Sequence, residues 1–435
     1  MSRLIDNFDE SARLKVAEKD TVSGWSVGMV IFGICLTLPS LYTGALAAQN
    51  LGAVGTAKAI GIASLVLASM SIPAAIVGAE TRLSSYLLIE FVFGRKGADF
   101  VNGLLGLTLL GWFAVTAGFF GQTLHIAFTE LFEVSLPVWS LTLISSLLIM
   151  LTTLFGFKAI DRLSMFAVPL LVLFLIYVAN LALQIQGFDS LLRIEPQDPD
   201  YFSTAVATII GSLIVGVVLM PDLSRYARSL KDCITASILG NGLGNAFSML
   251  IAVTPALATG FVDPMTYMIS LGVLGSALVI LVFATWTTNS VNLYSTTLAA
   301  AVIVPKVKEW KLMLGCGVFG TGVAVLGLAD YFITFLELLG VIVPPIAGIY
   351  LADYFILKRQ RFVLEDLDQV ADFDRAALVA WVIATVVSAY CFWVEFSATA
   401  IVSLDSLLVT IPIYLVCTKI WPVQFLRTAP EGEVV

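Results

Sequence analysis

The sequence predicts an all-α, polytopic membrane protein with twelve transmembrane helices in a single domain. Hydrophobic residues make up 59% of the 435-residue chain and charged residues only 12%, which is typical of membrane proteins and not of water-soluble domains. Apolar runs recur along the whole chain, and each is near the ~20 residues that a spanning helix needs. Basic residues gather in alternate connections between these runs, as in a chain that crosses a bilayer repeatedly.

The predicted spans lie between a cytoplasmic tail at 1–23 and a second tail at 419–435. The first ten lie within a core at 24–356, and two more lie within 376–418. In order they are 24–48, 57–79, 101–128, 136–156, 163–186, 203–221, 233–259, 270–300, 312–329, 332–356, 376–395 and 398–418. The polar and charged first tail does not resemble a cleaved secretory signal.

The basic residues predict the orientation. An even number of spans places both ends of the chain on the same side. With a cytoplasmic N-terminus, all of the 23 basic residues except Lys58 and Arg193 fall in cytoplasmic segments. The positive-inside rule therefore predicts an integral protein of the cell membrane, which is the inner membrane in a bacterium, with both termini cytoplasmic.

The remaining composition disfavours several functions. One histidine and five scattered cysteines supply neither a metal cluster nor a nucleophile–base pair, so we predict no catalytic residues, no cofactor and no enzymatic activity. Nucleic acid is not an expected partner, because no basic block lies outside the helix flanks. A channel would need a continuous polar lining, which the chain does not offer. A transporter-like sensor remains a less favoured reading.

A polar stripe on the eighth span indicates a site. The stripe consists of Thr285, Thr288 or Asn289, Asn292, and Ser295 or Thr296. Spacings of three and four place these residues on one face of a helix. In hydrocarbon such a face is costly unless it meets protein, a cavity or an ion. We therefore expect this helix to line a site for a small polar solute and a cation.

Two other spans are predicted to be broken within the membrane. Pro39 lies near the middle of the first span, where its missing N–H frees nearby carbonyl groups. In the sixth span, Gly211 and Gly216 bracket a short stretch, and Pro221 follows. Kinking or helix packing is the plainer role of such residues. Matched breaks in two halves of a chain nevertheless indicate a midplane site, and the pattern allows spans one to five and six to ten to be inverted repeats.

Three further features suggest how such a site works. Thr287 and Thr288, together with freed carbonyls of the first span, offer the neutral oxygen atoms that suit Na⁺. Glu337, in the tenth span, is the buried carboxylate that a proton-coupled carrier would use, although it could instead snorkel or bond a neighbouring helix. Trp112, in the third span, offers a flat surface on which a heterocycle can stack.

Several short motifs follow one another from about Gly24 to Arg361. They are Gly78-Ala79-Glu80-Thr81, Phe93-Gly94-Arg95-Lys96-Gly97, Gly111-Trp112-Phe113, Gly211-Ser212 with Asp222 and Arg225, Trp286-Thr287-Thr288-Asn289 with Leu293-Tyr294, Pro344-Pro345-Ile346-Ala347-Gly348, and Ala352-Asp353-Tyr354. In this order they resemble the cytosine permease branch of the nucleobase:cation symporter-1 family.

The resemblance implies a LeuT-type fold, with two inverted five-helix repeats plus two C-terminal helices. It also implies Na⁺-coupled import of a nucleobase or related small heterocycle, such as cytosine, by alternating access. The implied cation ligands are the main-chain carbonyls of Cys35, Leu38 and Ala284 and the hydroxyls of Thr287 and Thr288. The implied substrate pocket uses Trp112, the region of Ser212, and Asn289 or Asn292.

Two departures from the family pattern affect the substrate. Family members with known preferences carry a second aromatic residue at the position of Leu213, and a glutamine at the position of Leu109 or Thr116. Sites that read a ligand by hydrogen bonds reject analogues strongly, so these changes leave the substrate open. Cytosine, another pyrimidine, a purine, hydantoin, allantoin or a vitamin precursor all remain candidates, and H⁺ remains the alternative coupling ion.

Overall fold

A computed structural model describes residues 15–153, 157–304, 306–357, 362–364, 367, 370–399 and 401–422. The side chains of 157–168, Ile280, Phe283, Ala284, Thr287 and Val302 lie outside the described set. Nearly all of the described chain is helical, as predicted. The helices are α2 (Gly24–Cys35), α3 (Leu38–Thr81), α4 (Ser85–Phe93), α5 (Arg95–Phe132), α6 (Val138–Thr153), α7 (Phe157–Ile185), α8 (Phe188–Leu191), α9 (Phe202–Val218), α10 (Met220–Ser224), α11 (Leu230–Ser237), α12 (Asn245–Thr259), α13 (Pro264–Ser270), α14 (Leu274–Ile303), α15 (Glu309–Val325), α16 (Phe332–Ile342), α17 (Pro344–Ala352), α18 (Arg375–Trp393) and α19 (Val402–Ile420).

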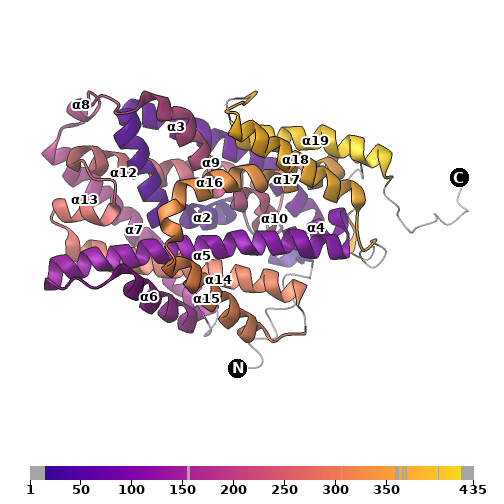
Figure 1. Cartoon of the computed structure of the whole chain (residues 1–435), viewed down its shortest axis with the longest axis horizontal. Coiled ribbons are helices and arrows are strands. Elements are labelled where there is room, and N and C mark those ends of the chain that lie inside the picture. The colour runs from indigo at the N-terminus through magenta and orange to yellow at the C-terminus, as the bar shows by residue number, and fades with distance from the viewer. Residues whose placement is uncertain are drawn as a thin grey trace, which may run out of the picture.

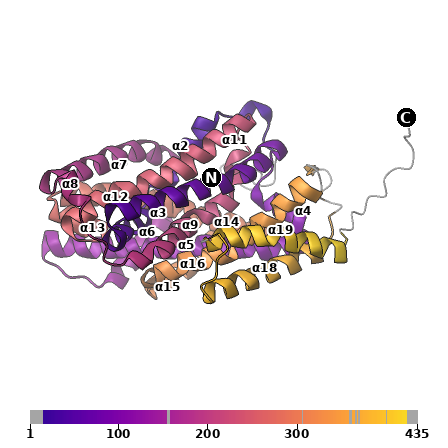
Figure 2. The same ribbon diagram turned by 90° about the horizontal axis from the view of Figure 1, so that it is seen from above.

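Short 3₁₀ and π segments join or extend these helices. The 3₁₀ segments are η1 (Glu18–Asp20), η2 (Pro199–Tyr201) and η4 (Leu328–Tyr331), and the π segments are η3 (Ile238–Gly244) and η5 (Asp353–Leu357). In Figure 1, α5 runs along the length of the molecule, with α8 and α13 at one end and α4 towards the other. The hairpin of α18 and α19 lies along one edge, and α7, α2 and α11 lie along the opposite edge in Figure 2.

Seven helices of the described chain are long and apolar enough to cross a membrane by length and composition. One of them, α3, has 44 residues and turns at Gly52, whose φ of 66° is a left-handed conformation that suits glycine. It therefore includes both the end of the predicted first span and the whole of the second. The helix order accommodates the twelve predicted spans, and their number stays a prediction.

The first span is broken as predicted. Helix α2 ends at Cys35, Leu36 and Thr37 are not helical, and α3 begins at Leu38. The Thr37 side chain accepts a hydrogen bond from the Ser40 N–H at 3.3 Å and so caps α3. Pro39 is the second residue of α3, where a missing N–H costs little because the first turn has no helical acceptor for it.

The sixth span is also broken, but not where the sequence predicted. Helix α9 ends at Val218 and α10 begins at Met220, so the break lies at Leu219, two residues before Pro221. The prediction of a break between Gly211 and Gly216 is wrong, because α9 is continuous there. The two breaks are nonetheless alike, since each second half-helix carries a proline as its second residue.

Close helix contacts account for Gly211. A Cβ atom at Gly211 would overlap the main-chain carbonyl of Leu336, so the missing side chain lets α9 and α16 approach each other. Helix α2 lies against α11 and η3 by the same means. A Cβ at Gly28 would come within 2.9 Å of the Leu239 side chain, and one at Gly240 would overlap Ile31.

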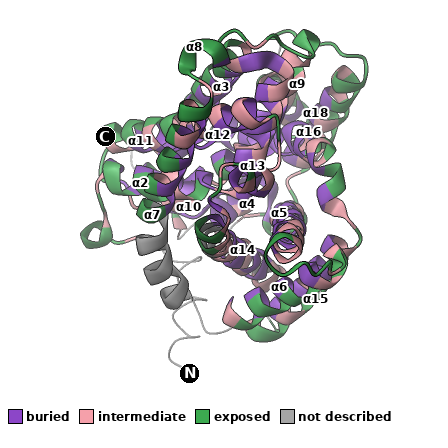
Figure 3. Ribbon diagram, turned by 90° about the vertical axis from the view of Figure 1, so that its left-hand side faces the viewer, coloured by how far each residue is buried: buried purple, intermediate pink, exposed green. Residues whose placement is uncertain are grey.

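Burial is concentrated where these helices meet. Figure 3 shows buried residues towards the middle of the bundle and exposed ones on the outward faces. The C-terminal hairpin is fixed to this bundle by its leading segment. Asp372, which precedes α18, forms ion pairs with Lys96 at 2.6 Å and Arg95 at 3.3 Å, and the Asp374 N–H donates to the Phe93 carbonyl at 2.9 Å.

Gly211 and Gly216 form a matched pair on α9 that tests the close contact. We expect Gly211→Ala to lower the free energy of unfolding by about 1–3 kcal/mol, because the new methyl group must push α9 away from α16. Gly216→Ala meets no atom within 4 Å and should be neutral or stabilising by up to ~1 kcal/mol, since alanine favours the helix. Thermal melting of the purified variants measures both. Equal melting temperatures would contradict the packing role of Gly211.

Candidate functional site

The π segment η3 contacts both broken helices. The Cys35 thiol, at the end of α2, points to the Gly240 carbonyl at 3.7 Å. The next residue, Asn241, donates from Nδ2 to the Met220 sulfur at the start of α10, at 3.8 Å. Consecutive residues of one segment therefore meet the two half-helices, and π segments are often found at functional sites.

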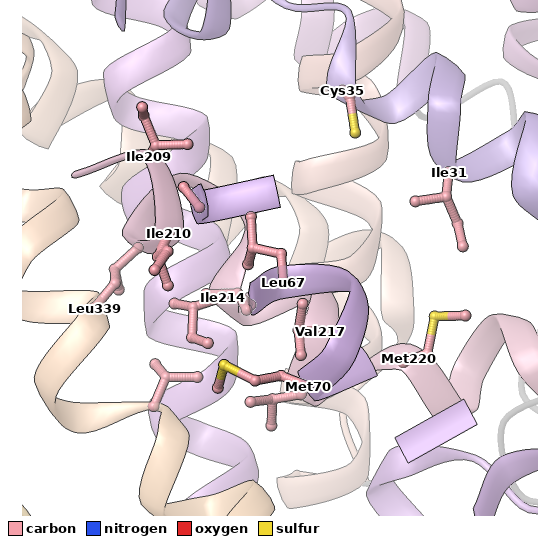
Figure 4. Packing of buried hydrophobic residues seen from close by; sticks show 14 of the residues in the cluster. Ile31, Cys35, Leu67, Met70, Ile209, Ile210, Ile214, Val217, Met220 and Leu339 are labelled. Carbon is pink, nitrogen blue, oxygen red and sulfur yellow. The ribbon is translucent and has the colours of Figure 1, made fainter. Parts of the chain in front are cut away.

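Apolar side chains fill the space around the two breaks. Figure 4 shows Cys35 and Met220 together with Leu67 and Met70 of α3 and with Val217 at the end of α9. All five side chains are at most 5% exposed. The broken backbone is thus enclosed by protein, as irregular backbone at membrane depth has to be.

A tyrosine from the tenth span satisfies the break in the sixth. Pro221 has no N–H, and the Asp222 N–H bonds to the Leu219 carbonyl at 3.0 Å, so the Val218 carbonyl loses its helical donor. The Tyr350 hydroxyl of α17 donates to this carbonyl at 3.1 Å, and the tyrosine is 1% exposed. Tyr350 therefore joins the end of α9, at the break, to α17.

Helix α14 carries the predicted polar stripe and lies against α5. The Asn289 side chain is fully buried, and its Nδ2 donates to the Phe113 carbonyl at 3.2 Å. Phe113 follows Trp112 in α5, so this bond holds the stripe at the level of the predicted stacking residue. The structure therefore brings Asn289 and Trp112 into the same region.

Three side-chain oxygens of α14 have no hydrogen-bond partner among the described residues. They are Oγ1 of Thr285, Oδ1 of Asn289 and Oγ of Ser290, and their side chains are 1%, 0% and 0% exposed. Such groups are costly when buried and call for a ligand, an ion or a water molecule. Ser290 was not predicted, because it lies one position beyond the three- and four-residue spacing of the stripe.

The other predicted residues of the eighth span are either less buried or bonded within the protein. Thr288 and Asn292 are half-buried. The Thr296 hydroxyl bonds to the Asn292 carbonyl of its own helix at 2.8 Å, so it is already satisfied. Trp286 turns away towards α6, where its Nε1 donates to the Thr152 hydroxyl at 2.8 Å.

The aromatic neighbours of Trp112 come from the tenth span. Phe335 and Phe332 of α16 meet the half-buried Trp112 ring edge to face, with centroids 5.5 and 6.2 Å away. Tyr42 of α3 and Phe119 of α5 extend the cluster, their centroids 5.2 Å apart. Aromatic side chains thus surround Trp112, although the family position for a second one carries leucine here.

The remaining predicted substrate residues, on α9 and α5, show no ring contact or hydrogen bond to Trp112 or Asn289 among the described residues. Leu213 is half-buried and packs against the main apolar cluster. The Ser212 hydroxyl donates to the Ile209 carbonyl of its own helix at 2.7 Å. Thr116, one turn beyond Trp112, is 2% exposed. The substrate roles of these three residues stay predictions.

The structure describes only some of the predicted cation ligands in full. Cys35 is fully buried and Leu38 is 2% exposed, and the Cys35 carbonyl accepts the Thr37 N–H at 3.1 Å across the break. The side chain of Thr287 lies outside the described residues, and no observation tests the carbonyl of Ala284 as a ligand, so this site stays a prediction. Glu337 is half-buried on α16.

Comparison with known proteins decides the family. A family model described as permease for cytosine/purines, uracil, thiamine, allantoin matches residues 15–410. The chain belongs to this permease family. The cytosine permease of Escherichia coli (strain K12) is 30% identical over 356 residues, which cover 82% of each chain. The hydantoin permease of Microbacterium maritypicum is 28% identical over 314 residues, covering 63% of this chain and 61% of its own.

Solved structures confirm the predicted LeuT-type architecture of this permease. The inward-facing conformation of Mhp1 aligns over 94% of both chains with a TM-score of 0.82 at 19% identity. Mhp1 is described as a nucleobase-cation-symport-1 family transporter, and its closed form with bromovinylhydantoin bound aligns with a TM-score of 0.80 at 18% identity, covering 95% of this chain and 96% of its own. At these identities the likeness shows the fold.

Some residues of the site were not found from the sequence. Tyr350, Phe335 and the π segment of the permease become apparent only when separate spans are brought together. A buried tyrosine in an apolar span needs a partner for its hydroxyl, and the run from Gly240 to Gly244 contains three glycines. Both features can be seen in the sequence, but neither shows which helix the tyrosine or the glycine-rich run contacts.

Tyr350→Phe tests the bond to the broken sixth span. The variant leaves the Val218 carbonyl buried without its donor, so we expect it to lower the free energy of unfolding by about 1–3 kcal/mol. Tyr390→Phe is the matched control, because Tyr390 lies on the outward face of α18 and is 61% exposed. Thermal melting compares the two. An equally small effect of both changes would show that the tyrosine bond does not stabilise the break.

Proposed function

We propose that this permease is a secondary active transporter that imports a nucleobase or related small heterocycle together with Na⁺ by alternating access. The observation that carries the proposal is a set of buried oxygens on α14 that have no hydrogen-bond partner among the described residues. They belong to the helix whose Asn289 bonds to the carbonyl of Phe113, the residue that follows Trp112. In a membrane permease, oxygens of this kind are suited to bind a polar solute.

The donor pattern narrows the substrate. The Phe113 carbonyl can only accept a hydrogen bond, so Asn289 presents Nδ2 to it and retains Oδ1 as an acceptor. The hydroxyls of Thr285 and Ser290 can also accept. We therefore propose a flat, uncharged ring that offers N–H or amino donors, as cytosine and hydantoin do. Trp112, with Phe335 beside it, supplies the stacking surface.

For coupling we propose Na⁺, held between the break after Cys35 and the hydroxyls of Thr287 and Thr288. The break is present, and among solved structures of the same fold a Na⁺-coupled sialic acid symporter aligns with a TM-score of 0.67 at 14% identity, over 97% of this chain and 96% of its own. An ion that joins spans one and eight would favour the state that binds substrate, and the substrate would in turn favour the ion.

Proton coupling is the second candidate. It is favoured by the position of Glu337 on α16, the helix whose Phe335 contacts Trp112. A carboxylate on that helix could link its movement to protonation.

We further propose that the chain is one transport domain in the cell membrane, the inner membrane in a bacterium, with both termini cytoplasmic. Two of the connections predicted to lie outside contain α8 and α13, which gather at one end of the molecule, away from α4 (Figure 1). Their common side supports the predicted alternation of the connections, and the basic residues supply the orientation.

Thr285 and Thr297 provide a matched test of substrate binding. Thr285→Val removes a hydroxyl that has no partner among the described residues, whereas Thr297→Val removes one that bonds to the Leu293 carbonyl of the same helix at 2.8 Å. We expect the first change to weaken cytosine or hydantoin binding about 2- to 10-fold, the value of one hydrogen bond, without lowering the melting temperature. The second should leave affinity unchanged. Calorimetry or radioligand binding measures affinity. If both variants bind substrate as tightly as the unmodified protein, Thr285 is not a substrate ligand.

Ion replacement tests the coupling. We expect radiolabelled substrate to bind the purified permease more tightly in Na⁺ than in choline, and Thr288→Val to remove most of the difference. Equal substrate affinity in the two salts would contradict Na⁺ coupling. A response to pH alone, abolished by Glu337→Gln, would assign the coupling to H⁺ instead.

A further inference from the structure

The C-terminal hairpin contains a cavity that lies apart from the proposed transport site. It has a volume of about 340 Å³ and lies between the end of α18, the start of α19 and the connection between them. The volume falls within the range of ~300–1,000 Å³ that is usual for ligand sites. On the helices it is lined by side chains such as Val387, Ser388, Cys391, Leu408 and Val409.

The surroundings of the cavity are those of a bilayer. Both helices are long and apolar enough to span a membrane, and Val386 of α18 and Leu408 of α19 are 61% and 46% exposed. Figure 2 places the hairpin at the edge of the bundle. Exposed apolar side chains in spanning helices at such an edge face lipid, so lipid is the molecule with direct access to the cavity.

Aromatic residues fix the depth of the cavity. Tyr390, Trp393 and Phe396 are each more than half exposed and lie at the end of α18 and in the connection. Such residues mark the level of the lipid headgroups. Ser388 lies five residues before Trp393, or about 7.5 Å deeper at 1.5 Å per residue. The cavity therefore reaches from the headgroup level into the first part of the acyl chains.

The polar groups of the cavity leave one hydroxyl available. The Asp405 carboxylate is used by the connection itself, since it accepts from the Ser397 hydroxyl at 2.5 Å and from the main-chain N–H groups of Ala398 and Thr399 at 2.8 and 3.1 Å. Ser388 is 3% exposed, and its Oγ has no partner among the described residues. It can donate to an ester carbonyl of a lipid at this depth.

The charge at this end of the hairpin selects the headgroup. From 376 to 418 the only charged residues are Glu395 and Asp405. Because Asp405 is bonded within the connection, the exposed Glu395 is the group that faces a headgroup. A headgroup with a primary amine complements it, whereas a net anionic headgroup would be repelled.

We propose that this cavity binds one acyl chain of an amine-bearing phospholipid, such as phosphatidylethanolamine. The apolar walls hold the chain, Ser388 donates to its ester carbonyl, and Glu395 pairs with the amine. The lipid would fill the groove of the hairpin on the lipid-facing side of the bundle. This site is independent of the substrate and of the coupling ion.

Native mass spectrometry of the full-length permease tests the proposal. The protein is released from nanodiscs that contain equal amounts of phosphatidylethanolamine and phosphatidylglycerol. We expect one phosphatidylethanolamine to be retained in preference to phosphatidylglycerol, and Glu395→Lys to reverse that preference. Retention without preference for either lipid, or no retained lipid, would overturn the proposal, and the unmodified protein alone decides this.

A second arm locates the lipid. Ser388→Phe fills the cavity and should remove the retained lipid, whereas Val386→Phe adds the same ring to the lipid-facing side of the same helix and should not. Ala398→Leu, at the connection, repeats the test if Ser388→Phe does not fold. Retention in all filled variants would overturn the assignment. A stable dimer that buries the hairpin without lipid would also overturn it, in favour of a second copy of the chain.

Discussion

The structure depends on the absence of water within the bilayer. Every backbone N–H and carbonyl at that depth has to find a partner in the protein, and two spans nevertheless leave the helical pattern, at 36–37 and at Leu219. Each break is compensated by its own partner. Thr37 caps the second half of the first span, and Tyr350 from α17 donates to the carbonyl that the break in the sixth span releases.

Contacts at the breaks also connect the two broken spans to other spans. The segment η3 contacts the end of α2 through Gly240 and the start of α10 through Asn241. Through η3, both half-helices contact the seventh span. Tyr350 adds the tenth span to the same network. On α14, by contrast, three buried oxygens have no hydrogen-bond partner among the described residues.

The region around Trp112 departs from the family pattern that the sequence resembles. The family aromatic position holds Leu213, and the glutamine positions hold Leu109 and Thr116. Aromatic rings reach Trp112 from α16 instead. If Trp112 is the stacking surface that we propose, its aromatic neighbours are supplied by the tenth span.

The sequence by itself determined the membrane class, the helical architecture, the family and the break near Pro39, because apolar length, charge position and a missing N–H act locally along the chain. It also singled out Asn289. The break in the sixth span was predicted at the wrong place, because Gly211 was taken as part of the break. That glycine instead allows close packing against the Leu336 carbonyl of another helix. Tyr350, Phe335 and Ser290 emerged only from the tertiary structure. A hydrogen bond between spans 132 residues apart depends on which helix faces which, and no local pattern specifies that.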